Sequence, residues 1–477
     1  MKFNHVPSFR PLLHAVCALL LVVTQMLPPM PAHALTIGEE RDIGEKLLYK
    51  IRTELHLLDD PDIVQYINRL GRMVVDQAGP QFFDYRFYLV PSDEFNAFAA
   101  PSGLIFFYTG LVKTMKTEDE LLSVMAHEIG HVVSRHISSR SDKAGKVGAI
   151  SMALALASLA IGDPSLASGL FTGFQAAGQA VTLHFSRQDE EEADRLSYDW
   201  LKALHRDPQA MEGMLGTMRR ITRYRSDQIP PYLLTHPNPE ARLDYVQSLL
   251  DYQQDKVQAG TYRETDNFEF LRLKYRAMVL VDDPQKTRAF FANAAATGSS
   301  PEEIAMATYG LALLEAKELN FSKALDNLDK VRAYFVDRPM LDVDEGIIHL
   351  DSGNAEKAIE LLGKALSSNP EDMYAAFHLA RANEMTGKVN EAERLYTKVM
   401  SVLPEYPRVY FEMGRIRASQ GRKGMSNFYL AKYYLYQGRM ELAKEYFKIT
   451  MDDSTVDSSV QEEADSILTR LDELEEM

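Results

Sequence analysis

Cysteine is almost absent from this chain: its 477 residues include a single one, Cys17. Without thiols beyond residue 17, the chain can form neither a disulfide framework nor a cysteine-ligated metal site. Any metal ion must therefore be bound by His, Asp or Glu. The scarcity of cysteine suits a protein of an oxidising compartment.

Positive charge is also in short supply, because 52 Lys and Arg stand against 68 Asp and Glu, a formal net charge of −16. This balance argues against nucleic acid or an anionic membrane as a bulk electrostatic partner. The chain is 46% hydrophobic and 25% charged, which is typical of a globular protein. Its length predicts two or more domains.

The first 34 residues differ from the rest of the chain. They begin with the weakly basic Lys2 and Arg10, continue through the apolar run "LLHAVCALLLVV" and end in "PMPAHA". The run is shorter than the roughly 20 residues of a membrane span, and A-x-A is a pattern that signal peptidase cleaves. We therefore expect a signal peptide over residues 1–34, cleaved after Ala34. An uncleaved anchor is the alternative.

A second apolar region, residues 144–186, consists of two uncharged runs separated by Asp163 and Pro164. The first run is too short for a bilayer span, and both runs are rich in Gly, Ala and Ser. We expect buried helices near the functional site, or a mobile hydrophobic flap, in preference to membrane spans. A peripheral membrane contact stays open.

Residues 35–255 alternate between two periodicities. Residues 36–78 have the pattern of amphipathic helices, whereas "YRFYLVPS" and "NAFAAPSGLIFFYTG" are rich in aromatic and β-branched residues and are interrupted by the turn signal Pro101-Ser102-Gly103. A long helix is expected to start at the "TEDE" capping signal of residues 117–120. We therefore predict an α+β domain with a small sheet that contains a hairpin.

Residues 265–477 contain an internal repeat with a period of 34 residues. Gly353, Gly387 and Gly421 follow this spacing, as do three further columns: Gly346, Ala380 and Gly414; Ala358 and Ala392; Pro370 and Pro404. Such a period is typical of tetratricopeptide repeats, whose small residues lie where two helices touch. An all-α solenoid with a concave binding surface is expected, separated from the first domain by the polar stretch 251–262. The whole chain is thus predicted to be mostly α.

The stretch "VMAHEIGHVVSRHI" places His127 and His131 four residues apart, with Glu128 directly after the first. On a helix, positions i and i+4 share one face, so both imidazoles can bind a single ion. Glu128 can reach a water on that metal and act as a general base. A motif of this length also arises by chance, and histidines satisfied in a protein core are the alternative.

A third ligand is required. His136 lies at the wrong spacing for the H-E-x-x-H-x-x-G-x-x-H arrangement. The segment "SRQDEEEADRLSYDW", residues 186–200, offers Glu190 as a ligand and Asp194 as a hydrogen-bond partner of a ligating histidine. An acidic first helical turn, stabilised by the helix dipole, is the other interpretation of these residues.

H-E-x-G-H followed by S-R-x-x-E-x-x-A-D resembles the zinc peptidases that include the HtpX proteases and the CAAX prenyl proteases. The flanking segments "NAFAAPSGLIFFYTGL" and "LLTHPNPEARL" match as well, so four blocks in family order span about residues 40–250. The resemblance implies a zincin-type metalloprotease domain with one Zn²⁺ per chain, bound by His127, His131 and Glu190, and with Glu128 as the base. It selects Glu190 among three consecutive glutamates. It also matches Asp194 to an aspartate that is sometimes assigned as a proton donor; we prefer a supporting role.

His236 and Arg242 belong to the downstream motif. In the subfamily that the chain resembles, the matching histidine approaches the zinc as an extra ligand and holds the enzyme latent, or it stabilises the oxyanion of the tetrahedral intermediate. A histidine at a helix entry, with Arg242 in a structural ion pair, is the remaining interpretation.

With an export signal and C-terminal repeats, the whole chain resembles periplasmic members of this family. The resemblance implies a periplasmic endopeptidase that degrades misfolded or stalled outer-membrane proteins, with chaperone-like help to productive ones. The repeats would dock these substrates or the outer-membrane β-barrel assembly machinery. An extended substrate would pair with the edge of a strand formed by Asn96, Ala97, Phe98 and Ala99.

Two other hypotheses remain. The repeats could act as a scaffold or chaperone beside a latent metal domain. Alternatively, residues 147–186 could span a membrane, as in the multi-spanning HtpX and CAAX proteases, although the chain lacks the credible spans of those enzymes.

Overall fold

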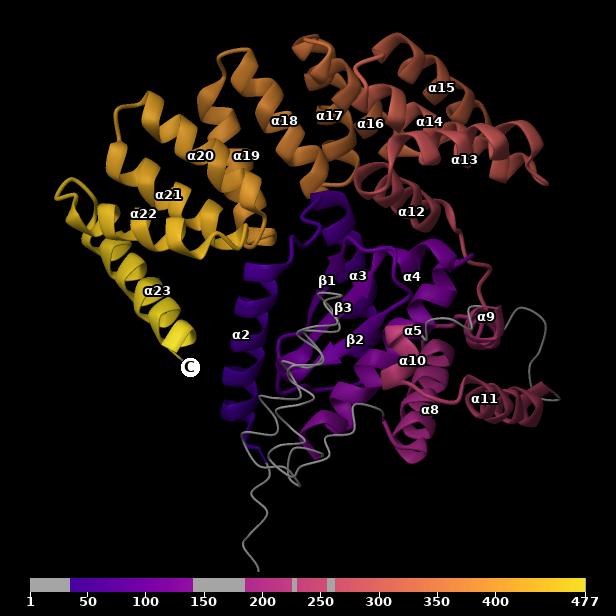
Figure 1. Cartoon of the computed structure of the whole chain (residues 1–477). Helices are drawn as coiled ribbons and strands as arrows, with labels where there is room; N and C mark the ends of the chain where they lie inside the picture. Colours follow the sequence, from indigo (N-terminus) through magenta and orange to yellow (C-terminus); the bar gives the residue numbers. More distant parts are fainter. Residues whose placement is uncertain (1–34, 140–184, 225–229, 255–261, 477) are drawn as a thin grey trace, which may run out of the picture.

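The computed structural model describes residues 35–139, 185–224, 230–254 and 262–476. The expected signal peptide and nearly all of the uncharged segment 144–186 lie outside these ranges. Within them the chain is mostly helical and contains one three-stranded sheet, which confirms the predicted fold class (Figure 1). No helix of the described ranges is long and apolar enough to cross a membrane.

The sheet consists of β1 (Arg86–Val90), β2 (Ala97–Ala100) and β3 (Leu104–Tyr108), in the order β1-β3-β2. Strands β2 and β3 are antiparallel and form the predicted hairpin, closed by the 3-10 turn η1 (Pro101–Gly103). Gly103 has φ +79°, a left-handed conformation that glycine adopts without steric cost. Strand β1 pairs with β3 in parallel. Both β1 and β2 are therefore edge strands of the sheet that the described residues form.

Helices cover both faces of the sheet. Side chains alternate between the faces along each strand, so Phe98 and Phe106 pack on α2 (Ile37–Glu54), while their neighbours along the strands pack on α3 (Pro61–Gln77) and α5 (Glu118–Val133). The short helix α4 (Thr109–Thr114) joins β3 to α5. Helix α5 is buried along almost its whole length, which fixes its position against β2.

Among the described residues, four further helices belong to the N-terminal part: α8 (Arg187–Ala203), α9 (Gln209–Tyr224), α10 (Pro231–Thr235) and α11 (Pro239–Gln254). Helices α8 and α9 pack against α5. Helices α5 and α8 approach each other closely at Gly130, where an added Cβ would lie 3.2 Å from the Cα of Ala193. The glycine in the histidine motif thus allows the two helices that carry the candidate site to come together.

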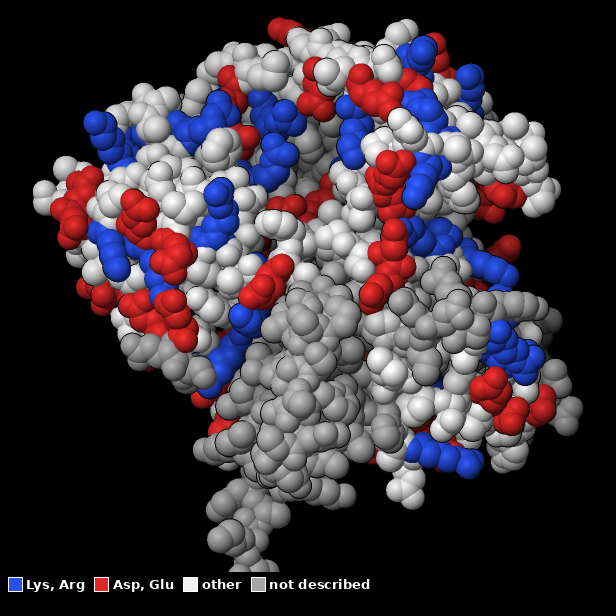
Figure 2. Space-filling view, viewed as in Figure 1, with Lys and Arg blue, Asp and Glu red and all other residues white. Residues whose placement is uncertain are grey.

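Helix α12 (Phe268–Val281) connects this part to an arch of helices, the repeat array, which spans α13 to α23 and curves over the N-terminal part (Figure 1). Its members are α13 (Pro284–Thr297), α14 (Pro301–Lys317), α15 (Phe321–Tyr334), α16 (Pro339–Asp351), α17 (Ala355–Ser368), α18 (Met373–Met385), α19 (Val389–Val402), α20 (Pro407–Ser419), α21 (Lys423–Tyr436), α22 (Met440–Asp452) and α23 (Ser458–Glu476). On the face shown in Figure 2, acidic and basic side chains are interspersed over these helices.

The repeat pattern read from the sequence is visible in the array. Gly353, Gly387 and Gly421 have φ of +88°, +79° and +76° and follow the first helix of three successive units. At Gly346 an added Cβ would lie 2.9 Å from a side-chain carbon of Leu362 in the partner helix. The small residues therefore lie where the two helices of a unit touch, as expected. The proposed domain boundaries remain a prediction.

A buried charge cluster joins α12 to α3 and to the array. Arg272 donates to Asp62 at 2.5 Å and makes two bonds of 3.1 Å to Asp344 of α16. One turn further along α12, Arg276 donates to Asp60 at 3.0 and 2.7 Å. Arg272 and Asp344 have side chains only 5% and 2% exposed, so this cluster fixes the start of the array against the N-terminal part.

Two further contacts attach the array later in its course. Glu405, between α19 and α20, accepts bonds from Arg52 (2.5 Å), Arg86 (3.1 Å) and the hydroxyl of Tyr88 (2.9 Å). The guanidinium of Arg470 on the final helix contacts Asp42 and Glu45 of α2. The array is thus attached to the N-terminal part at its start, its middle and its end.

Candidate metal centre

Four side chains that could hold a metal ion converge between α5, α8 and the end of α10. They are His127 and His131 of α5, Glu190 of α8, and His236 directly after α10, and one potential ligand atom from each lies within 4.8 Å of all the others. All four residues are at most 2% exposed. The sequence placed His127, His131 and Glu190 together, and the structure brings these three together.

The distances show how closely the groups converge. The Nε2 atoms of His127 and His131 are 3.1 Å apart, and Glu190 carboxylate oxygens lie 3.4 and 3.6 Å from them. Burial raises the pKa of Glu190, but His236 and Arg242 lower it more and hold it well below its ordinary value. Glu190 is therefore an ionised carboxylate in a dry cluster of imidazoles.

Asp194 and Arg242 support His127 at its Nδ1 atom, and Arg242 also pairs with Glu190 at 3.1 Å. The Nδ1 atom of His127 lies 2.9 Å from Oδ1 of Asp194, and Arg242 donates to both Asp194 oxygens at 2.9 and 2.7 Å. Burial raises the pKa of Asp194, but Arg242 and His127 lower it below its ordinary value. Burial and Arg242 lower the pKa of His127, whereas Asp194 and Glu190 raise it, to about 9. The arrangement fixes the His127 ring so that Nε2 points into the cluster.

His131 has its own support. Its Nδ1 atom lies 2.9 Å from Nδ1 of His136, and the ring of Phe185 stacks on it with a centroid distance of 3.9 Å. Burial and His127 lower the pKa of His131 well below its ordinary value, so the ring is neutral, the form that binds metals. His136 thus contacts the nitrogen of His131 that faces away from the cluster.

Glu128 lies between the cluster and the sheet. Its Oε2 accepts the backbone N–H of Ala99 in β2 at 3.0 Å, while Oε1 is buried without a hydrogen-bond partner, 3.5 Å from Nε2 of His236. The carboxylate is therefore held at the edge of β2 with one oxygen free on the side of the metal-binding groups.

His236 occupies the space between the ligating groups and Glu128. Its Nδ1 lies 2.9 Å from Oε1 of Glu190 and 3.3 Å from Nε2 of His127. The Tyr232 ring stacks on it at a centroid distance of 4.4 Å. Neither the Tyr232 stacking nor the Phe185 stacking was foreseen from the sequence, because spacing does not show which aromatic side chains cover a site formed by distant segments.

The chemistry of the donor set fits a bound cation. Within the described residues, Glu190 Oε2 and His236 Nε2 are buried without a hydrogen-bond partner. Glu190 Oε2 lies 3.1 Å from Nη1 of Arg242 in an ion pair, and the converging imidazole nitrogens cannot all donate to one another. A cation coordinated by the imidazoles and the carboxylate would satisfy these acceptors.

The strand expected to receive substrate is the outer strand β2. Ala97, Phe98 and Ala99 lie in it, and Asn96 directly precedes it and accepts a bond from the backbone N–H of Tyr108 at 3.1 Å. In the part of the chain that the structure describes, β2 pairs with β3 alone, and its other edge is the one that faces Glu128. The structure thus places this strand beside the candidate base.

Comparison with known sequences agrees with this geometry. Residues 62–250, which contain all four converging side chains, match "Peptidase family M48". This part of the chain is a peptidase M48 domain. Residues 349–410 match "Tetratricopeptide repeat". An M48 domain with a buried His/His/Glu/His cluster makes this chain a metallopeptidase by family.

Relatives of known name share the M48 domain, and some share nearly the whole chain. The chain is 27% identical over 463 residues to the beta-barrel assembly-enhancing protease of Escherichia coli (strain K12), covering 94% of this chain and 92% of that protein. It is 26% identical to the mitochondrial metalloendopeptidase OMA1 of Schizosaccharomyces pombe, covering 42% of this chain and 57% of that protein. It is 27% identical to the metalloprotease LoiP of Escherichia coli (strain K12), covering 38% and 66%.

Proposed function

We propose that this chain is a periplasmic zinc endopeptidase that hydrolyses peptide bonds in misfolded or stalled outer-membrane proteins. The observation that carries the proposal is the position of Glu128, whose buried carboxylate lies between the metal-binding groups and the edge of a strand. His127, His131 and Glu190 would hold the ion. Two imidazoles and a carboxylate are a donor set of catalytic zinc, which polarises a carbonyl and lowers the pKa of a bound water.

The chain's own residues would divide the work as follows. Glu128 Oε1 takes a proton from the attacking water and passes it to the leaving amine. The edge of β2 holds the substrate as an added strand, which requires no particular side-chain sequence and so suits unfolded segments. Asp194 positions His127; its lowered pKa keeps it ionised and speaks against a role as proton donor.

His236 is proposed to hold the resting site latent. A fourth protein ligand fills the coordination position that a catalytic site keeps open for water. We therefore expect His236→Ala to raise the rate of hydrolysis of an unfolded protein about tenfold while the metal content stays at one ion per chain. The control is His349→Ala, on α16 in the repeat array. A fall of about 10²–10³-fold in His236→Ala would instead assign His236 to the oxyanion.

Three observations support the cellular role. The relative aligned over nearly the whole chain is named a beta-barrel assembly-enhancing protease. The first 34 residues have the pattern of an export signal, and the remaining chain has no cysteine. The repeat array provides surface for a protein partner, for which we propose unfolded outer-membrane proteins or their assembly machinery.

The role is tested with a purified chain that begins at residue 35 and a β-barrel outer-membrane protein, supplied either unfolded or folded in detergent. We expect cleavage of the unfolded form only, loss of cleavage on chelation, and recovery with Zn²⁺. Equal cleavage of both forms would contradict the role in quality control. Activity that survives complete metal removal would contradict the metal-dependent mechanism.

A further inference from the structure

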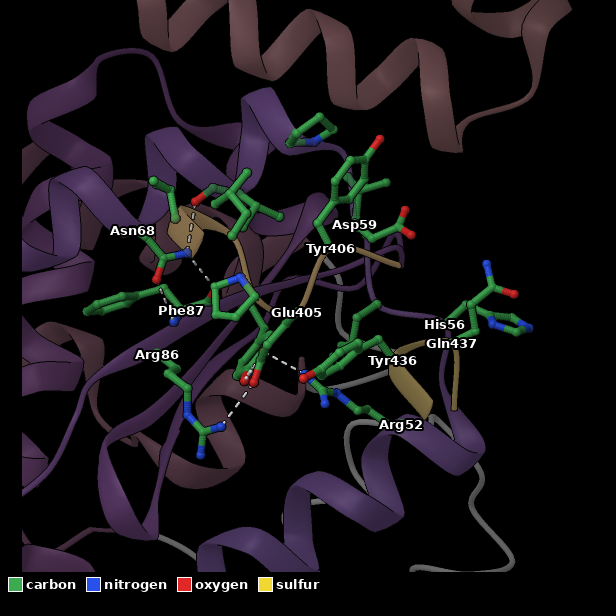
Figure 3. A pocket seen from close by; sticks show the side chains of 18 of the residues that line it. Arg52, His56, Asp59, Asn68, Arg86, Phe87, Glu405, Tyr406, Tyr436 and Gln437 are labelled. Atoms are coloured by element: carbon green, nitrogen blue, oxygen red, sulfur yellow. Dashed lines mark hydrogen bonds and ion pairs between the residues drawn. The ribbon is translucent and has the colours of Figure 1, made fainter. Parts of the chain in front are cut away.

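A cavity of about 430 Å³ lies away from the metal centre, where the repeat array meets the M48 domain (Figure 3). Three segments form its walls: residues 55–59, one face of α3 with Val64 and Asn68, and the loop 402–406 of the array. Its floor is Tyr85 to Tyr88, which includes the start of β1. The cavity therefore lies along the edge of the sheet opposite to β2.

The open edge of β1 is occupied at Phe87 by a single side chain. Asn68 donates its Nδ2–H to the carbonyl of Phe87 at 3.3 Å and accepts the N–H of Phe87 at 3.4 Å. In an antiparallel sheet, a residue of the neighbouring strand would make the same two hydrogen bonds, one to the carbonyl and one from the N–H of Phe87. Both bonds are long, and Asn68 Nδ2 also has a shorter bond, 2.8 Å, to the carbonyl of Val64. The carboxamide thus substitutes weakly for a missing strand.

The adjacent position on the same edge already has a main-chain partner. Leu58 donates its N–H to the carbonyl of Leu89 at 2.9 Å. Residues 57–58 therefore follow the line that a strand beside β1 would take, and the cavity continues this line past Phe87 toward Tyr85. At about 3.3 Å per residue, four residues of an added strand would span about 13 Å.

The charges at the cavity favour an acidic ligand. Its lining includes three arginines, Arg52, Arg72 and Arg86, against two carboxylates, Asp59 and Glu405. Glu405 pairs with both Arg52 and Arg86, and burial raises the pKa of Asp59. Arg72 is exposed and makes no ion pair with any residue of the described ranges. A cationic excess therefore remains beside an open strand edge.

We infer that this cavity binds an extended, acidic peptide segment that adds to β1 at Phe87 and displaces the carboxamide of Asn68. Backbone N–H and C=O groups of the peptide take over the two bonds of Phe87, and a carboxylate pairs with Arg72. The apolar lining, which includes Leu57 and Leu403, receives the alternate side chains. This second peptide site is independent of the metal.

The test uses fluorescence anisotropy on the chain from residue 35 with Glu128→Gln, which prevents cleavage. The probe is a fluorescein-labelled hexapeptide of alternating valine and threonine with a central aspartate. Methylation of alternate backbone nitrogens is expected to weaken binding about tenfold, because it removes main-chain donors. Asn68→Ala is expected to strengthen binding several-fold, and thermal unfolding without peptide checks that this variant is folded.

Two charge-reversing variants, one at the cavity and one away from it, test the role of Arg72. Arg72→Glu is expected to weaken binding of the aspartate peptide about tenfold and to strengthen binding of its lysine counterpart. Arg394→Glu, the same change at an exposed residue of α19, should leave the affinity for both peptides unchanged. Equal effects of the two variants, or equal affinity of plain and methylated peptides, would overturn the inference. Binding that is abolished by chelation would place the peptide at the metal centre and would also overturn it.

Discussion

Glu128→Gln is expected to lower peptide hydrolysis by about 10²–10⁴-fold while the metal content stays unchanged, because the amide cannot accept the proton of the attacking water. The amide oxygen can still accept the N–H of Ala99, so the strand contact is kept. The change therefore separates proton transfer from metal binding. It is measured as cleavage of an unfolded protein together with metal analysis of the same preparation.

Glu191→Gln is the matched control for this experiment. Glu191 neighbours Glu190 in sequence, but it pairs with Arg187 on the helix surface and is not one of the four converging side chains. The rate of hydrolysis by Glu191→Gln should stay within about twofold of that of the unmodified chain. Hydrolysis by Glu128→Gln at a rate within tenfold of the original would rule out Glu128 as the base. Unaltered function of Glu128→Gln in cells would favour a scaffold or chaperone that acts through the repeat array.

Arg272→Met is expected to lower the free energy of unfolding by about 3–5 kcal/mol, because it leaves Asp62 and Asp344 without their common cation in a buried site. Arg276 remains nearby, 3.6 Å from Asp62 and 4.0 Å from Asp344, but its hydrogen bonds go to Asp60. The effect is measured by urea unfolding, and limited proteolysis shows whether the array loosens from the M48 domain.

Arg338→Met tests whether the effect depends on burial. Arg338 pairs with Asp266, and the two side chains are 32% and 54% exposed. An exposed pair of this kind contributes about 0–1 kcal/mol, so this variant should unfold close to the unmodified chain. A loss of stability in Arg272→Met no larger than in Arg338→Met would show that the buried cluster does not hold the array in place.

The sequence predicted what depends on periodicity and local turns. The hairpin at Pro101-Ser102-Gly103, the burial of α5 and the glycines that follow the first helix of each repeat all have a local cause, so a single sequence shows them. The three consecutive glutamates show where this local information ends. Helical spacing put them in one turn, and the resemblance to a family, rather than spacing, selected Glu190, whose carboxylate points at the histidines in the structure.

Contacts between distant segments had no sequence signal. Arg272 and Asp62 are 210 residues apart, and Arg86 and Glu405 are 319 apart. Amphipathic patterns show that a helix face is buried but not which surface it meets. The same limit applies within the site: the role of His136 behind His131 depends on the path of the chain after α5, which the H-E-x-x-H pattern does not determine.

The three attachments of the repeat array have a consequence for how this protein can evolve. In an open solenoid each unit contacts only its neighbours, so units can be gained or lost at little cost. Here Arg272, Glu405 and Arg470 tie successive parts of the array to fixed points on the M48 domain. Inserting one 34-residue unit between α12 and α20 would carry Glu405 away from Arg52 and Arg86. The copy number of the repeats is therefore constrained by the shape of the domain that they surround.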